Sequence, residues 1–221
     1  MADFLTARIK MVENQLRANK VTDERLIDAM RECPRERFAP PAKRSVAYAD
    51  EDLPIAPGRW LMEPMLFARL AQLAEIEEGD LVLDVGVGLG YGAAVLARLA
   101  SAVVALEEDP DLAEEAAKAL GELEAGAGDT VVVETGPLSE GWSGQAPYDV
   151  IFLEGAIEAR PTALLDQLAD GGRLVAMQRG PNGVQRGTLY LKRGGSVAER
   201  AVFDGATPVL PGFAAAPAFT F

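Results

Sequence analysis

From residue 81 onward, short runs of apolar residues alternate with segments that have a helical pattern. The runs are rich in Val, Ile and Leu: LVLDVG, AVVALEE, TVVVE, YDVIFLEG and GGRLVAM. Helical segments are expected over roughly residues 89–100, 109–124 and 161–169, between most of the runs. Strands that alternate with helices in this way form a parallel sheet buried on both faces. The pattern therefore predicts an α/β fold.

The two ends of the chain differ from this pattern. GTLYLKR and AERAVFD, separated by GGS, predict an antiparallel C-terminal hairpin. Thr22 is expected to cap a second helix near the N-terminus, after a first helix whose apolar residues have helical spacing: Leu5, Ile9, Val12 and Leu16. We expect an N-terminal helical appendage and loop over 1–60 and an α/β domain over 61–221, together forming one compact unit.

The composition limits the chemistry that the chain can perform. It has 221 residues, no histidine and a net charge of −13, from 21 basic and 34 acidic residues. Without histidine, serine–histidine and cysteine–histidine catalysis and most zinc sites are excluded, so no metal site is expected. The acidic excess disfavours a nucleic-acid partner. The one cysteine, Cys33, is expected to be a buried structural thiol.

The sequence also indicates where the protein resides. No uncharged apolar run of about 18 residues occurs, which disfavours a membrane span. The first 20 residues carry charges throughout and lack the apolar core of a secretory signal. We therefore expect a cytoplasmic protein without a membrane partner.

A glycine-rich turn follows the first strand of the α/β region, in LDVGVGLGYGAAV. Gly86, Gly88 and Gly90 stand at every second position between the strand, which ends near Asp84, and the next helix. A glycine lets the backbone approach a ligand closely or adopt a positive φ, and Asp84 can accept hydrogen bonds there. Dinucleotide sites have G-x-G-x-x-G, with a pyrophosphate at the helix N-terminus. Because the third glycine comes one residue early here, a cofactor without a pyrophosphate fits better.

An acidic residue at the end of the second strand supports this interpretation. Glu107 follows Gly86 by 21 residues and could accept hydrogen bonds from both hydroxyls of a ribose. Glu108 is the alternative if the strand runs one residue longer. The glycine turn, this acid and the absence of a phosphate-binding lysine motif together indicate S-adenosylmethionine as the cofactor.

At these residues the sequence resembles the protein-L-isoaspartate O-methyltransferases, over nearly the whole chain. The similar segments are MVENQLRANKVTDERLIDAMRECPRERFAPP, AYADEDLPIAPG, VLDVGVGLGYGAAVLARLA, APYDVIF and LLDQLADGGRLVA. The resemblance implies a Rossmann-like methyltransferase fold and methyl transfer from S-adenosylmethionine to the α-carboxylate of an isoaspartyl residue, which initiates protein repair. Such a carboxylate is ionised at neutral pH and needs no general base, so we nominate no catalytic residue.

The chain departs from that family at the loop before the helix and after the fourth strand. The family usually has Gly-Xaa-Thr-Ile-Ser-Xaa-Pro, whereas this chain has GRWLMEP, with Trp60 and Met62 in place of the two hydroxyl residues. After the fourth strand, Glu154 replaces a threonine. We predict that these three residues line the substrate pocket, where Trp60 could stack on the sulfonium and Glu154 could pair with it yet repel a carboxylate. The alternative is that they only pack.

The adenine-binding region departs as well. Pro137 stands where the family often has an acidic residue, and Glu134 is a candidate substitute. Leu138 is included among the residues predicted to bind the cofactor.

Three functions remain open on the sequence alone. The first is carboxyl methylation of isoaspartyl sites in a protein or peptide substrate. The second is methylation of another acceptor, such as a small molecule, and the third is non-catalytic binding of S-adenosylmethionine. The C-terminal aromatic residues either fold back onto the domain or form a homodimer contact: Phe213, Phe219 and Phe221.

Overall fold

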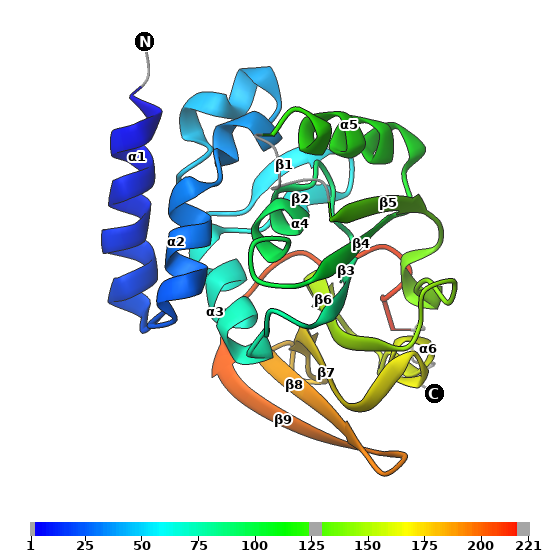
Figure 1. Ribbon diagram of the computed structural model, residues 1–221. Helices are drawn as coiled ribbons and strands as arrows, with labels where there is room; N and C mark the ends of the chain where they lie inside the picture. The colour runs from blue at the N-terminus through cyan, green and yellow to red at the C-terminus, as the bar shows by residue number, and fades with distance from the viewer. Residues whose placement is uncertain (1–2, 124–129, 216–221) are drawn as a thin grey trace, which may run out of the picture.

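The computed structural model describes residues 3–123 and 130–215. A seven-stranded sheet forms the centre of the molecule (Figure 1). Its strands are β3 (Leu81–Val85), β4 (Ala102–Glu107), β5 (Val131–Thr135), β6 (Tyr148–Ile157), β7 (Leu168–Arg179), β8 (Gln185–Arg193) and β9 (Ser196–Asp204). The order is β5-β4-β3-β6-β7-β8-β9; the first five strands in this order are parallel, and β8 and β9 are antiparallel. Both the parallel sheet and the C-terminal hairpin predicted from the sequence are confirmed.

The order of the strands reverses beside β3. The chain runs outward from β3 to β4 and β5 on one side, and then returns to place β6 on the other side of β3. In open parallel sheets, ligands bind outside the carboxyl ends of the strands at such a reversal. The fold therefore places the glycine turn that follows β3 at the expected position of a ligand site.

The helices of the α/β region begin at residues suited to a helix N-terminus. They are α3 (Pro64–Ala74), α4 (Tyr91–Leu96), α5 (Pro110–Gly121) and α6 (Thr162–Asp166). Pro64 and Pro110 occupy the first turn, where no backbone N–H is needed. Asp109 caps α5 by accepting from the amides of the first turn. Each predicted helix is present but shorter, because turns follow α4 and α5 within the described residues and β7 begins at Leu168, soon after α6.

The N-terminal region is helical, as predicted. It contains α1 (Phe4–Met11), η1 (Val12–Leu16), η2 (Arg17–Asn19), α2 (Glu24–Glu32), η3 (Arg35–Phe38) and η4 (Pro41–Val46). Two details of the prediction are wrong. Asp23, not Thr22, caps α2, because its carboxylate accepts from two first-turn amides. Leu5 and Ile9 are exposed, because α1 lies on the outer side of α2 (Figure 1), whereas Val12 and Leu16 are buried.

A small second sheet precedes α3. Its two strands, β1 (Leu53–Ala56) and β2 (Arg59–Leu61), pair antiparallel within the segment that the sequence predicted only as an ordered loop. The predicted boundary at residue 60 falls inside β2. One continuous group of buried apolar side chains extends from Met11 in the N-terminal region to Met177 in β7.

Two further sequence predictions can be checked in the core. Cys33 is fully buried, as expected, and burial raises the pKa of its thiol to about 12, which makes it unreactive. Phe213 folds back and is buried, whereas Phe219 and Phe221 lie outside the described residues. Among the described residues, no helix has both the length and the hydropathy needed to cross a bilayer.

Candidate active site

The turn after β3 requires glycine at three positions. Gly86, Gly88 and Gly90 have φ values of +83°, +54° and +91°, which side chains disfavour. The amide of Gly86 donates to Leu106 O at 2.8 Å, which ties the turn to β4. Gly90 is the N-cap of α4, which begins at Tyr91. The spacing recognised in the sequence therefore corresponds to a real constraint on the backbone.

Glu107 at the end of β4 points at this turn. One of its oxygens accepts the amide of Gly88 at 2.8 Å, and the other accepts the amides of Glu108 and Asp109 at 2.9 and 3.1 Å. The Glu107 side chain is fully buried, whereas Glu108 is mostly exposed. Of the two acids that the sequence left open, Glu107 is the one that faces the turn.

Asp84 and Glu154 form a buried carboxyl pair beside the turn. Asp84 lies on β3 and Glu154 on the neighbouring β6. Burial raises the pKa of Asp84 to about 7, against a hydrogen bond from Glu154 that lowers it. The pKa of Glu154 is raised well above its ordinary value, first by burial and then by the charge of Asp84. Neither Asp84 oxygen has a hydrogen-bond donor while both groups are ionised, and the raised pKa values of both carboxyls favour one proton shared between Glu154 and Asp84.

The pair makes stability depend on pH. For an acid whose folded pKa is raised, the native state binds more protons than the unfolded state between the ordinary pKa near 4 and the raised pKa. The free energy of unfolding therefore falls as pH rises through this window, by about 1.4 kcal/mol per pH unit for each group. Urea unfolding of Glu154→Gln at several pH values between 5 and 7 should show that the free energy of unfolding depends less steeply on pH than in the wild type. The reason is that the amide donates to Asp84 without titrating.

A comparison variant tests the assignment to this pair. The pKa of Glu63 is also raised to about 7, by burial and by two neighbouring acids. Glu63→Gln should remove only the contribution of Glu63 to the pH dependence of the free energy of unfolding. The contribution of Asp84 and Glu154 should remain. Equal slopes for Glu154→Gln and the wild type would mean that the carboxyl pair does not share a proton.

The three residues predicted to line the substrate pocket do not all lie together. Trp60 and Glu154 border a cavity of about 10 Å³, which is otherwise lined by Gly58, Arg59, Thr207, Pro208, Val209 and Leu210. Met62 is buried in the core, and its carbonyl accepts Arg35 Nη2 at 2.6 Å. The structure thus brings Trp60 and Glu154 together at one cavity. Met62 follows β2 directly, and its side chain is buried in the core.

Sequence reasoning missed Arg59, the residue next to Trp60. Burial alternates along β2, so that Arg59 and Leu61 face inward while Trp60 is partly exposed. Arg59 forms a buried ion pair with Glu107, 48 residues away. A single arginine in an expected loop ordinarily indicates a solvated side chain, so no local signal could reveal this pair.

An open hollow lies just past the ends of β4 and β5. Glu108, Asp109, Gly136 and Pro137 line this cavity of about 500 Å³. Leu138, predicted to bind the cofactor, has its side chain buried in the core. The hollow lies immediately beyond Glu107 in the chain.

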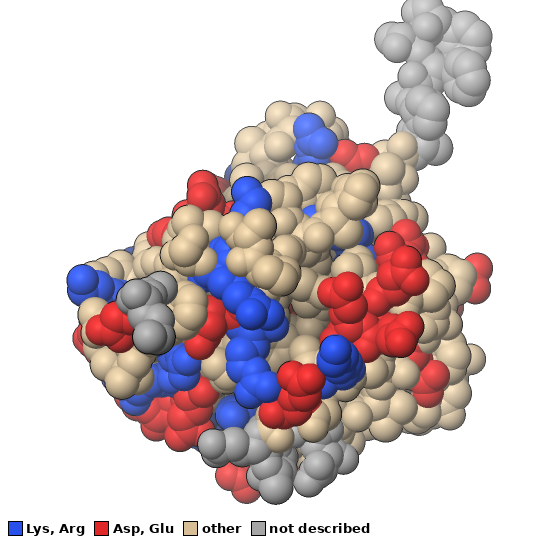
Figure 2. Space-filling model, turned by 90° about the horizontal axis from the view of Figure 1, so that it is seen from above, with Lys and Arg blue, Asp and Glu red and all other residues tan. Residues whose placement is uncertain are grey.

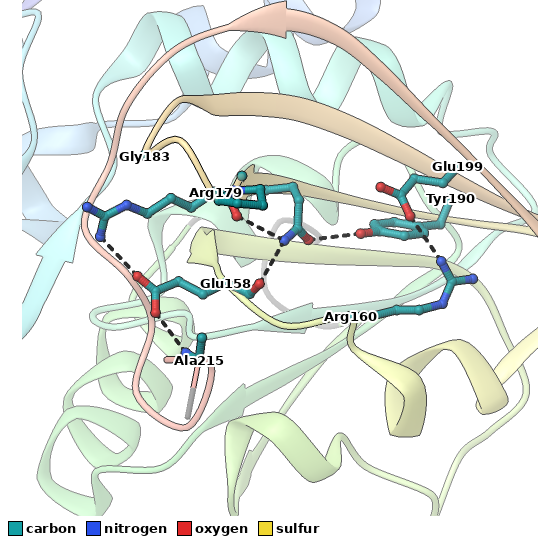
Figure 3. A pocket seen from close by; sticks show the side chains of 10 residues that line it. Glu158, Arg160, Arg179, Gly183, Tyr190, Glu199 and Ala215 are labelled. Carbon is teal, nitrogen blue, oxygen red and sulfur yellow. Dashed lines mark hydrogen bonds and ion pairs between the residues drawn. The ribbon is translucent and has the colours of Figure 1, made fainter. Parts of the chain in front are cut away.

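Another cavity lies past the ends of β6 and β7 (Figure 3). It has a volume of about 740 Å³, but its lining contains none of the turn residues. Arg179 pairs with Glu158 at 2.9 Å, and Arg160 pairs with Glu199 at 3.0 Å and stacks over Tyr190. These charged groups already satisfy one another, so this cavity offers less to a charged ligand than the site beside the turn.

Charge is unevenly distributed over the surface. Figure 2 shows one face on which Lys and Arg side chains gather in a band, bordered by Asp and Glu. A net charge of −13 therefore coexists with a locally basic strip. The sequence-based expectation that nucleic acid is no partner rests on the net charge alone and stays a prediction.

Comparison with known proteins identifies the family. The sequence profile of the family "Protein-L-isoaspartate(D-aspartate) O-methyltransferase" matches residues 7–204. The chain belongs to the protein-L-isoaspartate(D-aspartate) O-methyltransferase family. This confirms the resemblance drawn from the sequence, and with it an S-adenosylmethionine-dependent methyltransferase.

Relatives and solved structures agree with this assignment. Protein-L-isoaspartate O-methyltransferase 2 of Anaeromyxobacter sp. (strain Fw109-5) is 43% identical over 178 residues, covering 80% of this chain and 72% of that protein. The protein-L-isoaspartate O-methyltransferase of Methanoculleus marisnigri is 42% identical, with 86% and 84% covered. A solved protein-L-isoaspartate O-methyltransferase has a TM-score of 0.79 at 25% identity, covering 93% of this chain and 66% of that one.

A second solved structure supports the fold alone. It comes from Plasmodium falciparum, is described as in complex with S-adenosyl-L-homocysteine, and has a TM-score of 0.77 at 19% identity. It covers 92% of this chain and 97% of its own. The Rossmann-like methyltransferase architecture predicted for this family member is therefore confirmed.

Proposed function

We propose that this chain methylates the carboxylate of isoaspartyl residues in a protein or peptide, with S-adenosylmethionine as the methyl donor. The observation that carries the proposal is the Glu107 carboxylate, which accepts the Gly88 amide at 2.8 Å within a turn of three positive-φ glycines. This arrangement suits a nucleoside ligand at the strand-order reversal. Membership of the family supplies the acceptor class.

The residues around the turn fit the donor. The glycines leave the backbone of the turn without Cβ atoms, at positions where φ is positive, so a ligand that displaces the neighbouring side chains can approach the backbone closely. The Asp84 carboxyl lies beside the turn and has lone pairs beyond the one that faces Glu154, so it can accept from a cationic amino group. The donor would be held at the turn by Asp84, Gly86, Gly88, Gly90 and Glu107, with the adenine toward Pro137 and Leu138.

The chain's own residues then have to align an acceptor rather than activate it. The donor supplies a methyl group already bonded to a positively charged sulfur. An isoaspartyl carboxylate is ionised at neutral pH, so a chain without histidine can perform the reaction. Alignment of the reacting atoms can contribute roughly 7–11 kcal/mol.

An ionised Glu154 would repel an acceptor that carries a carboxylate. Two like charges 4 Å apart cost about 4 kcal/mol at an effective dielectric of about 20. Burial raises the pKa of Glu154 well above its usual range, which favours the neutral form and reduces this cost. The departure from threonine at this position is therefore compatible with a carboxylate acceptor.

The proposal is tested by methanol release from an isoaspartyl peptide after incubation with S-adenosylmethionine. The peptide with ordinary aspartate at the same position is the matched substrate control. Turnover is expected with the isoaspartyl peptide, and Gly88→Ala should reduce it at least about 100-fold, because a side chain is disfavoured at φ +54° and its Cβ would occupy space that the donor needs beside the backbone.

Gly171→Ala is the matched control variant. Gly171 has φ +85° and no atom within 4 Å of an added Cβ, so this change imposes the same kind of backbone strain away from the turn. Its turnover should stay within about threefold of the wild type. Binding of S-adenosylhomocysteine without methanol release would exclude the isoaspartyl acceptor and direct the search to small-molecule acceptors or a sensor role.

A further inference from the structure

Arg59 lies where a ribose would have to lie in order to contact Glu107. It is the first residue of β2, is 4% exposed, and forms an ion pair with the fully buried Glu107 carboxylate. The same carboxylate accepts three backbone amides, those of Gly88, Glu108 and Asp109. Four donors thus converge on this carboxylate, three of them on Oε1, and two ribose hydroxyls would have to compete with Arg59.

The small β1–β2 sheet also covers the bare backbone of the turn. The position of a Cβ on Gly88 lies 2.5 Å from Ile55 Cδ1, and Ile55 belongs to β1. The position of a Cβ on Gly86 lies 2.9 Å from Leu210 Cδ2 and 3.5 Å from Arg59 Nη2. Side chains of the protein itself thus fill the space that the glycines create.

Little volume is left at the centre of the site. The cavity beside Arg59, Trp60 and Glu154 measures about 10 Å³, enough for roughly one water molecule. Sites for ligands of nucleoside size measure about 300–1,000 Å³. The hollow of about 500 Å³ at Glu108 and Pro137 is open. The part of the site expected to hold the adenine is therefore accessible, whereas the part beside Arg59 is closed.

We propose that Arg59 is a tethered cation that closes the donor site, and that the β1–β2 segment moves away when S-adenosylmethionine binds. The segment is a two-stranded sheet joined through Gly58, which has φ +72° and no atom within 4 Å of its Cβ position. A local movement about this turn would withdraw both Ile55 and Arg59. This inference rests on the donor-binding part of the proposed function.

Charge balance explains why an arginine suits this role. Asp84, Glu107 and Glu154 are all buried around the site. The guanidinium of Arg59 compensates the negative charge of Glu107 while the site is closed. The donor and S-adenosylhomocysteine share an ammonium group and two ribose hydroxyls that can donate to carboxylates, so the carboxylates are not left unpaired when Arg59 leaves.

The test is titration calorimetry with S-adenosylhomocysteine on the wild type, Arg59→Gln and Arg186→Gln. Removing Arg59 relieves the closed state, so Kd for Arg59→Gln should be at least about tenfold lower than for the wild type. Arg186 forms an exposed ion pair with Asp204 on the β8–β9 hairpin, so its variant matches the charge change and should bind like the wild type.

Hydrogen exchange supplies a readout that is independent of affinity and activity. Saturating S-adenosylhomocysteine should increase exchange of the amides of residues 53–61 in the wild type. Ile55→Ala, which uncovers Gly88 without touching the ion pair, should also lower Kd and provides a second variant should Arg59→Gln fold poorly.

Two results would overturn the proposal. Equal or weaker binding by Arg59→Gln and Ile55→Ala would show that these side chains do not exclude the donor. Unchanged or reduced exchange at residues 53–61 on binding would show that the segment stays in place. Absence of methanol release by the wild type, together with tighter binding by Arg59→Gln, would instead contradict the isoaspartyl acceptor alone.

Discussion

Replacing Phe152 by alanine is expected to lower the free energy of unfolding by about 3–5 kcal/mol. Phe152 lies on the central strand β6 and is fully buried. Its ring is 5.1 Å from that of Phe67 on α3, which is 5.8 Å from Tyr91 on α4, and Tyr91 is 5.9 Å from Phe38. The four rings connect the sheet to the N-terminal region, so the cavity would disrupt contacts on several elements.

The measurement is urea unfolding of the wild type, Phe152→Ala and Phe203→Ala. Phe203 on β9 is the matched control, because it is only partly buried and the Arg69 guanidinium carbon lies 3.9 Å from its ring centroid. Its loss should be about 1–2 kcal/mol. Similar losses for the two variants would mean that the aromatic cluster is not the main support of the sheet.

Replacing Arg35 by alanine is expected to cost about 3 kcal/mol or more. Its guanidinium is fully buried and donates to Ala47 O at 2.7 Å and Met62 O at 2.6 Å. It also lies 4.7 Å from the centroid of Tyr91. Removal leaves two buried carbonyls without donors, at about 1–3 kcal/mol each, and loses the cation–π contact.

Arg37 provides the control for this variant, two residues further along the chain. It is exposed and pairs with Glu122 at the surface, so Arg37→Ala should change the free energy of unfolding by less than about 1 kcal/mol. Arg35→Lys should not restore stability, because an ammonium lacks the planar fork that reaches both carbonyls. Full rescue by lysine would show that charge rather than geometry holds this segment.

Features that depend on neighbouring residues were predictable from the sequence. The spacing of Gly86, Gly88 and Gly90 and the apolar runs identified the turn, the parallel sheet and the terminal hairpin, because each pattern reflects local backbone needs. Glu107 was found because βαβ units have a nearly constant length. The cap of α2 was misplaced by one residue, since Thr22 and Asp23 both suit that role.

Features that depend on long-range contacts were not predictable. The β1–β2 sheet consists of strands of four and three residues, too short to give an alternation pattern. The pair between Arg59 and Glu107 joins positions 48 residues apart. The protonated pair of Asp84 and Glu154 arises from the β3–β6 pairing, which only the strand order specifies. For this reason Glu154 was predicted as a pocket residue without its partner.

The row of aromatic rings has a consequence for how this protein can diverge. Phe38 comes from the N-terminal third of the chain, whereas Phe152 belongs to β6, one of the two strands that flank β3. A chimera that joined the first 60 residues of one relative to the remainder of another would have to match the ring positions of both parents. Recombination across that junction should yield misassembled proteins unless both parents have the four aromatic rings in the same positions. The first 60 residues and the remainder of the chain are therefore expected to be inherited together.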